Sequence, residues 1–435
     1  MADWITVPSI AGIAVCVVFI IVGHLRRTTP EDFYLGHKQY ITYTSAMSIV
    51  AAFTGGSAFL NTTALAERYG YWAFFDVFPA VGGLFVSFLL ALYGIFSKQF
   101  SNVFFDVGTE TYNKKAVTLH YIQVTFLYLL VIAAQFRAVA TFAEYLGIHA
   151  FAAVVVVALA VGAYAFRGFG AITRTDVLQL ILMMPMYIAL AVLAGEPRQV
   201  TIGSSGHEPM PWSLAMALCL PFFFLPISQE LHQRGASSRD DKSLRYSYLL
   251  AGIVYLFLAS AIVIIFSYKD LSISSIIRGK NIVAACIVTV AVASAIMSTL
   301  DTATNIASHA AQKLRPFRYY PSWAVQAVFL AAGAILYLFF PTVLSLILFA
   351  MFVYMSGPAL TFLSVYLGLR AKTVSVVNTT YCGIHAFIHF EFVERPSFAT
   401  VREILPTVDP IPLSLLALVF QLLTLLLLGI WRRFH

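Results

Sequence analysis

The stretch SIVAAFTGGSAFLNTTALAERYG, residues 48–70, is a largely apolar span with two adjacent glycines near its middle. Glycine weakens a helix, because it adopts backbone dihedral angles that are closed to other residues. The run Thr54-Gly55-Gly56-Ser57 therefore predicts either a break in a membrane helix or a point where another helix packs closely. A break would expose backbone carbonyl oxygens at mid-membrane, where they can coordinate ions.

The whole chain is as apolar as this stretch. Of its 435 residues, 60% are hydrophobic and 11% are charged, whereas a soluble domain carries roughly 25% charged residues. We therefore predict an all-α integral membrane protein with one transmembrane domain over residues 1–435. A bilayer core needs about 20 apolar residues per helix. Thirteen segments fit, near 8–25, 42–65, 72–97, 117–145, 148–166, 172–194, 210–230, 245–267, 281–312, 321–339, 342–369, 373–390 and 411–431.

The placement of basic residues predicts the orientation, because lysine and arginine favour cytoplasmic loops. With the N-terminus outside, 19 of the 27 Lys and Arg residues fall inside, seven fall outside, and Arg137 lies within a helix. We expect a multi-pass cell-membrane protein whose C-terminus is cytoplasmic. The net charge of +7 does not indicate nucleic-acid binding, because the basic residues are scattered singly between apolar runs.

The segment AVASAIMSTLDTATNIASHAAQKL, residues 291–314, has polar side chains spaced three and four apart, which form one stripe along a helix. Small and hydroxylated residues in such a stripe could let helices pack closely. That role accounts poorly for Asp301 and Asn305, since polar groups in a membrane are costly unless they are paired. Hydroxyls one turn apart suit a small hard cation such as sodium. The stripe consists of Ser294, Ser298, Asp301, Thr302, Asn305 and His309.

Two further charged residues have two interpretations each. Asp176, in GFGAITRTDVLQL, lies just inside a predicted helix, where it either favours the helix dipole or serves a site. Arg137, in LLVIAAQFRAVATFAEYLG, lies past the middle of its helix toward the outside. Arg137 either extends to the outer surface or binds an anionic solute group, because a guanidinium matches a carboxylate.

Four segments together resemble the sodium:solute symporter family. They are EDFYLGHKQYITYTSAMSIVAAFTGGSAFLNTTALAERYG, GFGAITRTDVLQL, HQRGASSRDDKSLRYSYLL and SAIMSTLDTATN, in the family's order and on matching helices. In the third, Gln233, Arg234, Ala236, Arg239 and Asp240 are similar to a cytoplasmic loop of the family. The resemblance implies the LeuT-like five-plus-five inverted-repeat fold, with residues 42–194 and 210–369 as the repeats. Residues 8–25 would then be a peripheral helix, and 373–435 would hold two C-terminal helices.

The resemblance also implies binding residues. A sodium ion would be held by the backbone carbonyls of Ala51, Thr54 and Ala295 and the hydroxyls of Ser298 and Thr299. A second sodium would lie at Asp176, Ser298, Asp301 and Thr302. The candidate solute-binding residues are Phe53, Gly55, Gly56, Ser57, Ala58, Gln135 and Arg137.

We therefore expect a sodium-coupled symporter that imports a small organic solute by alternating access. Arg137 indicates a carboxylate-bearing solute, and the aromatic run PFFFLP at 221–226 argues against a sugar, which needs many hydrogen bonds. One alternative is a transporter-like sensor that binds a solute without moving it. Another is proton coupling through Asp176 or Asp301. An enzyme is disfavoured, because the chain has no HExxH or GxSxG motif.

Overall fold

The computed structural model describes residues 2–24, 33–36, 40–106, 114–194, 207–268, 271–279, 281–366, 368–391 and 410–434, and these ranges form a bundle of helices. Each of the thirteen segments predicted from hydropathy contains helix. Ten of them are single helices. These are α1 (Ala2–His24), α4 (Phe74–Leu92), α6 (Lys114–Tyr145), α7 (Ala150–Ala165), α8 (Phe169–Ala194), α12 (Asp241–Tyr268), α14 (Ile282–Gln312), α15 (Ser322–Leu336), α18 (Ala371–Glu391) and α20 (Pro410–Phe434).

The other three segments are interrupted helices. Residues 42–65 form α2 (Thr42–Phe53) and α3 (Gly56–Tyr69). Residues 210–230 belong to a series of short pieces: α9 (Trp212–Leu218), α10 (Leu220–Phe224), the 3₁₀ turn η2 (Leu225–Ile227) and α11 (Gln229–Ser237). Residues 342–369 form α16 (Val343–Tyr354), the π-helical turn η4 (Met355–Ala359) and α17 (Leu360–Tyr366).

Proline explains two of these interruptions. Proline has no backbone N–H and its ring collides with the preceding turn, so it breaks or widens a helix. Pro221 and Pro226 are the second residues of α10 and η2, and Pro358 lies inside the π-helical turn. Short elements connect the long helices: η1 (Gly70–Ala73), α5 (Lys98–Phe105), α13 (Ile273–Arg278) and η3 (Tyr337–Phe339).

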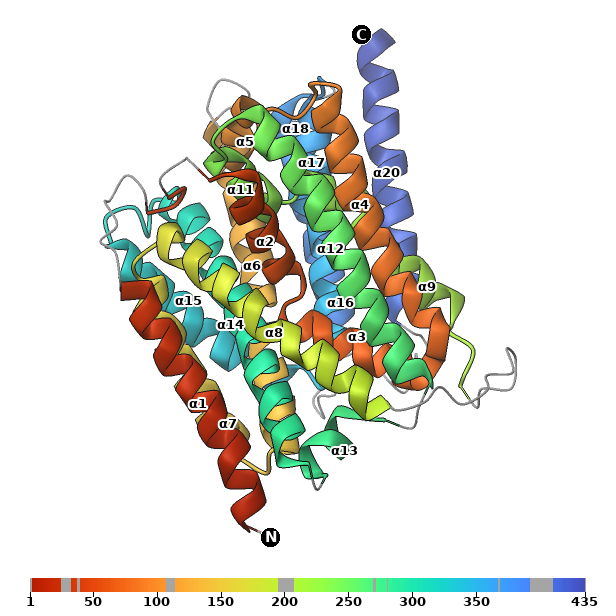
Figure 1. The fold of residues 1–435 in the computed structure, drawn as a ribbon. Coiled ribbons are helices and arrows are strands. Elements are labelled where there is room, and N and C mark those ends of the chain that lie inside the picture. Colours follow the sequence, from red (N-terminus) through yellow and green to blue (C-terminus); the bar gives the residue numbers. More distant parts are fainter. Residues whose placement is uncertain are drawn as a thin grey trace.

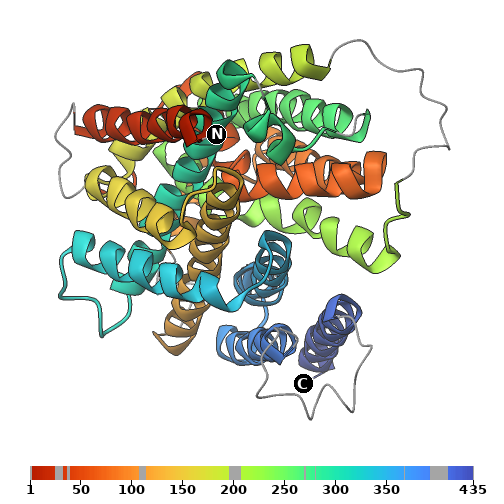
Figure 2. The same cartoon turned by 90° about the horizontal axis from the view of Figure 1, so that it is seen from below.

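The surface of the bundle is that of a membrane protein. Within the described ranges, nine helices are long and apolar enough to cross a bilayer, and Thr42–Phe53 and Ala150–Ala165 are shorter apolar helices. Large apolar side chains point outward, among them Leu159 (69% exposed) and Phe257 (71% exposed). Figure 1 shows the two termini at opposite ends of the bundle, and Figure 2 shows α18 and α20 at one edge of it. The chain is a multi-pass membrane protein, as predicted.

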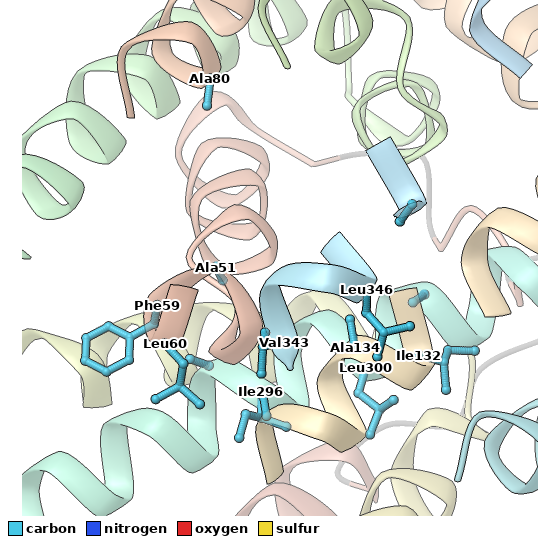
Figure 3. Close-up of a cluster of buried hydrophobic side chains, with 14 of the residues drawn as sticks. Ala51, Phe59, Leu60, Ala80, Ile132, Ala134, Ile296, Leu300, Val343 and Leu346 are labelled. Atoms are coloured by element: carbon cyan, nitrogen blue, oxygen red, sulfur yellow. The ribbon is translucent and has the colours of Figure 1, made fainter. Parts of the chain in front are cut away.

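Helix α14 lies at the centre, packed against α1, α2, α3, α6, α7, α8 and α15. Its residues from Ser294 to Ala311 are all buried, including the predicted polar stripe. Figure 3 shows buried apolar side chains of the core, among them Ala51 of α2, Ile296 of α14 and Val343 of α16. The polar stripe is therefore enclosed by protein and is shielded from lipid.

One predicted boundary is wrong. The apolar segment 210–230 is predicted to end at residue 230, which would put Arg234 in a cytoplasmic loop. Instead, the Ser228 hydroxyl accepts a hydrogen bond from the Leu231 N–H and starts α11, which continues to Ser237. Arg234 is only 2% exposed. An arginine is seldom buried unless it is paired, and its partner lies 58 residues away in sequence, beyond the reach of local patterns.

Candidate functional site

The break predicted in residues 48–70 is present. Helix α2 ends at Phe53, Gly55 has an extended conformation (φ −51°, ψ 156°), and α3 begins at Gly56. The glycines also permit close packing. A Cβ atom on Gly55 would lie 1.8 Å from the Thr299 Oγ1 atom, and one on Gly56 would lie 1.9 Å from the Ile296 Cγ1 atom. The break and the helix contact, which were alternatives in the sequence, occur at the same place.

The residues expected at the first sodium site lie on α2, on α14 and at the break, and α2 and α14 pack against each other and against α8. The Thr299 hydroxyl of α14 donates a hydrogen bond to the carbonyl of Ala52, in the last turn of α2, at 2.9 Å. The Thr54 hydroxyl turns back to its own helix and donates to the Val50 carbonyl at 2.7 Å. Ala51 and Ala295 are buried as well. Ala52, the last alanine before the break, joins this group although the sequence did not single it out.

Ser298 contacts α8. Its hydroxyl donates to Asp176 Oδ1 at 2.7 Å. The other carboxylate oxygen, Oδ2, accepts a hydrogen bond from the Ser48 hydroxyl of α2. It also accepts one from the Arg234 guanidinium at 3.2 Å. Asp176 and Arg234 are a buried ion pair, with side chains 0% and 2% exposed. Asp176 therefore joins three helices, which a role at a helix terminus alone would not require.

Arg234 organises the residues expected at the second sodium site. Its guanidinium donates to the Ser48 hydroxyl at 2.9 Å and to the Thr302 hydroxyl at 3.2 Å. Asp301 has a separate partner, since its Oδ2 atom accepts from the Tyr164 hydroxyl of α7 at 2.7 Å. Asp176, Ser298 and Thr302 therefore lie in one buried network with Arg234, and Asp301 is buried nearby but takes no part in these hydrogen bonds. The cation of this network in the structure is the guanidinium of Arg234. Nothing in the sequence indicated Ser48 or Tyr164, and Arg234 was expected in a cytoplasmic loop, because each is recognisable as part of a buried network only through its distant partner.

A cavity of about 190 Å³ adjoins the break. Phe53, Ser57, Ala58 and Gln135, four of the expected solute-binding residues, line it together with Thr299. Gln135 is fixed against the start of α3: its Nε2 atom donates to the Ser57 hydroxyl at 2.6 Å, and its Oε1 atom accepts from the Ser57 N–H at 3.1 Å. The remaining lining residues are Ala52, Leu127, Tyr128, Val131, Ala134, Phe224, Leu225, Ser228, Glu230, Ile347, Ala350, Met351 and Tyr354.

Arg137 does not line this cavity. Its guanidinium donates to the Pro341 carbonyl at 2.6 Å, in the connection that precedes α16. Gly55 and Gly56 lie beside the cavity and face α14. The charged group that does line the cavity is Glu230 in the first turn of α11. Glu230 lies four positions after the end of the PFFFLP run, but the apolar segment was predicted to end at this residue, so the sequence did not indicate that Glu230 lines a cavity.

Comparison with known proteins supports the fold. No protein family model matches the chain, and no curated protein matches it. A Na⁺-coupled sialic acid symporter, solved substrate-bound and outward-open, superposes with a TM-score of 0.63 at 13% identity, over 87% of this chain and 98% of the other. Mhp1, a nucleobase-cation-symport-1 family transporter closed around bromovinylhydantoin, gives 0.55 at 15% identity, over 93% and 95%.

A third solved structure agrees. The manganese transporter of Eremococcus coleocola, in complex with an aromatic bis-isothiourea substituted compound, superposes with a TM-score of 0.53 at 12% identity, over 89% of this chain and 95% of the other. Likeness at such low identity shows the fold alone. The all-α LeuT-like fold expected from the resemblance is confirmed.

Proposed function

We propose that this chain, built on the LeuT-like fold, is a secondary transporter that couples sodium influx to the import of a small organic solute. One observation carries the proposal: the Thr299 hydroxyl of α14 meets the Ala52 carbonyl at the end of α2, 2.9 Å away, where the helix is broken beside a cavity. Interrupted helices at mid-membrane are how transporters of this kind present carbonyl oxygens to ions and solutes.

The available donors fit sodium. The carbonyls of Ala51, Thr54 and Ala295 and the hydroxyls of Ser298 and Thr299 are oxygen ligands, which hard cations prefer. All five residues are buried, so an ion held there would be shielded from water and lipid. In this proposal they bind the ion, and the ion connects α2 to α14.

Coupling follows from shared helices. Thr299 belongs to the proposed sodium site and also lines the cavity. Phe53, at the end of α2, lines the cavity too. A ligand changes a conformational equilibrium by the difference in its affinity for the two states. Sodium and solute that both stabilise one arrangement of α2 and α14 would each raise the affinity for the other. That reciprocity is what sodium-driven accumulation needs.

The network at Asp176 bears on a second ion. Asp176, Ser298, Asp301 and Thr302 remain our proposal for a second cation site, in which sodium would share Asp176 with Arg234. Buried in this part of the described structure are three carboxyl groups, Asp176, Glu230 and Asp301, and one guanidinium, Arg234. This excess of acidic groups supports a bound cation. The same excess favours the alternative in which Asp176 or Asp301 carries a proton.

The experiment uses purified protein and compares two double variants on the same helix. Ser298→Ala with Thr299→Ala removes the hydroxyls proposed to bind sodium. Ser294→Ala with Thr289→Ala is the matched control, because those hydroxyls donate to carbonyls of α14 itself, at 2.7 and 2.8 Å. Thermal unfolding in NaCl against KCl, and exchange of radioactive sodium in proteoliposomes, report on the ion.

We expect the parent and the control to be stabilised by sodium and to exchange it, and the Ser298–Thr299 variant to lose both properties. Full retention of the sodium response in that variant would contradict the site. Accumulation of solute against a gradient separates a transporter from a sensor, which would bind solute and accumulate none. Uptake driven by a pH gradient without sodium would favour the proton-coupled alternative.

We also propose that the C-terminal end of the bundle faces the cytoplasm. The excess of Lys and Arg in the segments at that end supports this orientation. Protease or cysteine-labelling access at each end of the protein in sealed membranes tests it.

A further inference from the structure

We propose that the cavity beside the break binds a small organic cation, an alkyl or aromatic amine or a quaternary ammonium group, with Glu230 as its counter-charge. This inference rests on the proposed transport function and names the solute class of the same site. It departs from the carboxylate-bearing solute that Arg137 indicated in the sequence.

The charge of the cavity is the first argument. Glu230 lines it, and none of the described residues around it is a lysine, arginine or histidine. The guanidinium of Arg234 lies nearby, but it forms its hydrogen bonds mainly with other side chains. It reaches Asp176, Ser48 and Thr302, and it touches Glu230 only at the backbone carbonyl, at 3.2 Å. A solute carboxylate would meet another buried carboxyl group here, whereas an ammonium group would form an ion pair with it.

The helix N-termini at the cavity are the second argument. The start of a helix often binds anions through its unpaired N–H groups. Here three of these groups already have partners within the chain. At α11, the Gln229 N–H donates to the Tyr354 hydroxyl at 3.1 Å, and the Leu231 N–H donates to Ser228 at 3.2 Å. At α3, the Ser57 N–H donates to Gln135 at 3.1 Å. An anionic solute would have to displace these bonds.

The aromatic walls are the third argument. Phe53, Tyr128, Phe224 and Tyr354 all line the cavity. The rings of Phe224 and Tyr354 stand edge to face, with centroids 4.7 Å apart and planes at 82°. The Tyr354 hydroxyl already forms two hydrogen bonds within the chain: it donates to the Ile227 carbonyl at 2.7 Å and accepts from the Gln229 N–H. Tyr354 therefore offers a solute chiefly its ring, and ring faces attract ammonium groups.

A purely structural role for Glu230 is the competing explanation. A carboxylate in the first turn of a helix is stabilised by the helix dipole, with no ligand needed. That role predicts a loss of stability when Glu230 is neutralised, and it predicts no preference for cationic solutes. The experiment must therefore measure solute preference as well as stability.

The test measures binding to the purified full chain by calorimetry and thermal shift. The probes are phenethylamine and benzyltrimethylammonium as cations, 3-phenylpropanoate as the matched anion, and 2-phenylethanol as the neutral analogue. We expect the cations to bind at least tenfold more tightly than the anion. Glu230→Gln should weaken cation binding at least tenfold and leave the neutral analogue unchanged. Glu144→Gln, at an exposed position of α6, is the matched control and should bind like the parent.

Tighter binding of 3-phenylpropanoate than of the amines by the parent would overturn the inference, and this comparison needs no variant to fold. Equal cation affinity in parent and Glu230→Gln would also overturn it. If Glu230→Gln fails to fold, Glu230→Asp, which keeps the charge on a shorter side chain, should retain the preference for cations over the anion. A sodium response that depends on Ser298 and Thr299, found without any amine binding, would leave the transport proposal standing while this inference fails.

Discussion

Arg234 of α11 donates a hydrogen bond to Asp176 of α8 at 3.2 Å, and both side chains are buried. The pair joins two helices that belong to different halves of the chain, and through Ser48 and Thr302 it reaches α2 and α14 as well. Four helices that surround the candidate sodium site thus share one ionic network.

The first prediction concerns this pair. Arg234→Gln leaves the Asp176 carboxylate buried without its counter-charge, and removal of one partner from a buried pair costs about 3–5 kcal/mol. We expect a marked fall in the unfolding temperature in detergent. Arg239→Gln is the control, because its pair with Asp240 is largely exposed and exposed pairs contribute about 0–1 kcal/mol. The double variant Arg234→Gln with Asp176→Asn should recover much of the loss. Equal stability of Arg234→Gln and Arg239→Gln would show that the pair carries little energy.

The second prediction concerns the two glycines of the break. Gly56→Ala puts a methyl group 1.9 Å from Ile296 in α14, and overpacking of this kind costs about 1–3 kcal/mol. We expect lower stability and weaker sodium exchange, and the same for Gly55→Ala, which meets Thr299. Gly383→Ala in α18 is the control, because a Cβ atom there has nothing within 4 Å. It should be neutral or slightly stabilising, since alanine favours helix over glycine by up to about 1 kcal/mol. Unchanged sodium exchange in both break variants would argue against close contact there.

The third prediction distinguishes the roles of Gln135 and Arg137 in solute binding, although the two residues lie only two positions apart on α6. Gln135 lines the cavity and holds Ser57, whereas Arg137 donates to the Pro341 carbonyl. Gln135→Ala should weaken binding of phenethylamine several-fold, because it frees the start of α3. Arg137→Gln should leave the affinities for phenethylamine and 3-phenylpropanoate unchanged and lower stability by about 1 kcal/mol through the lost hydrogen bond. A tenfold loss of 3-phenylpropanoate affinity in Arg137→Gln would restore the anion-binding role.

The fourth prediction is a pH dependence at the start of α12. The Ser243 N–H donates to Asp240 Oδ1 at 2.7 Å. This bond, together with the one from Arg239, lowers the pKa of Asp240 to about 2. A lowered pKa adds stability above the unfolded-state value near 3.9, and that stability is lost as the pH falls toward 2. Asp240→Asn keeps an N-cap side chain but cannot titrate. The difference in unfolding temperature between the two proteins should narrow between pH 5 and pH 3. If the difference in unfolding temperature stays constant over that range, it does not arise from the titration of Asp240.

The sequence predicted the features that depend on local composition. Apolar length located the helices, the Gly55-Gly56 pair located the break, and the spacing of polar residues located the buried stripe of α14. The features that the sequence could not predict depend on contacts between residues that are far apart in the sequence. Arg234 was expected in a loop, because a lone arginine is usually exposed, and only Asp176 makes its burial favourable. Glu230 was overlooked for a related reason: its place in the cavity is set by η2 and the new helix start at Ser228, which local hydropathy does not reveal.

The broken helix has a consequence for biogenesis. Residues 42–53 form a helix of 12 residues, about 18 Å long, which is shorter than the hydrocarbon core of roughly 30 Å. Unpaired backbone groups at the break are costly in lipid, and the Thr299 hydroxyl that covers the Ala52 carbonyl comes 247 residues later. The segment must therefore be inserted by the translocon before the partner that stabilises its break has been synthesised. Residues 42–69 would enter as one continuous helix, and the break would form only when α14 docks, so the ion site is completed late in assembly.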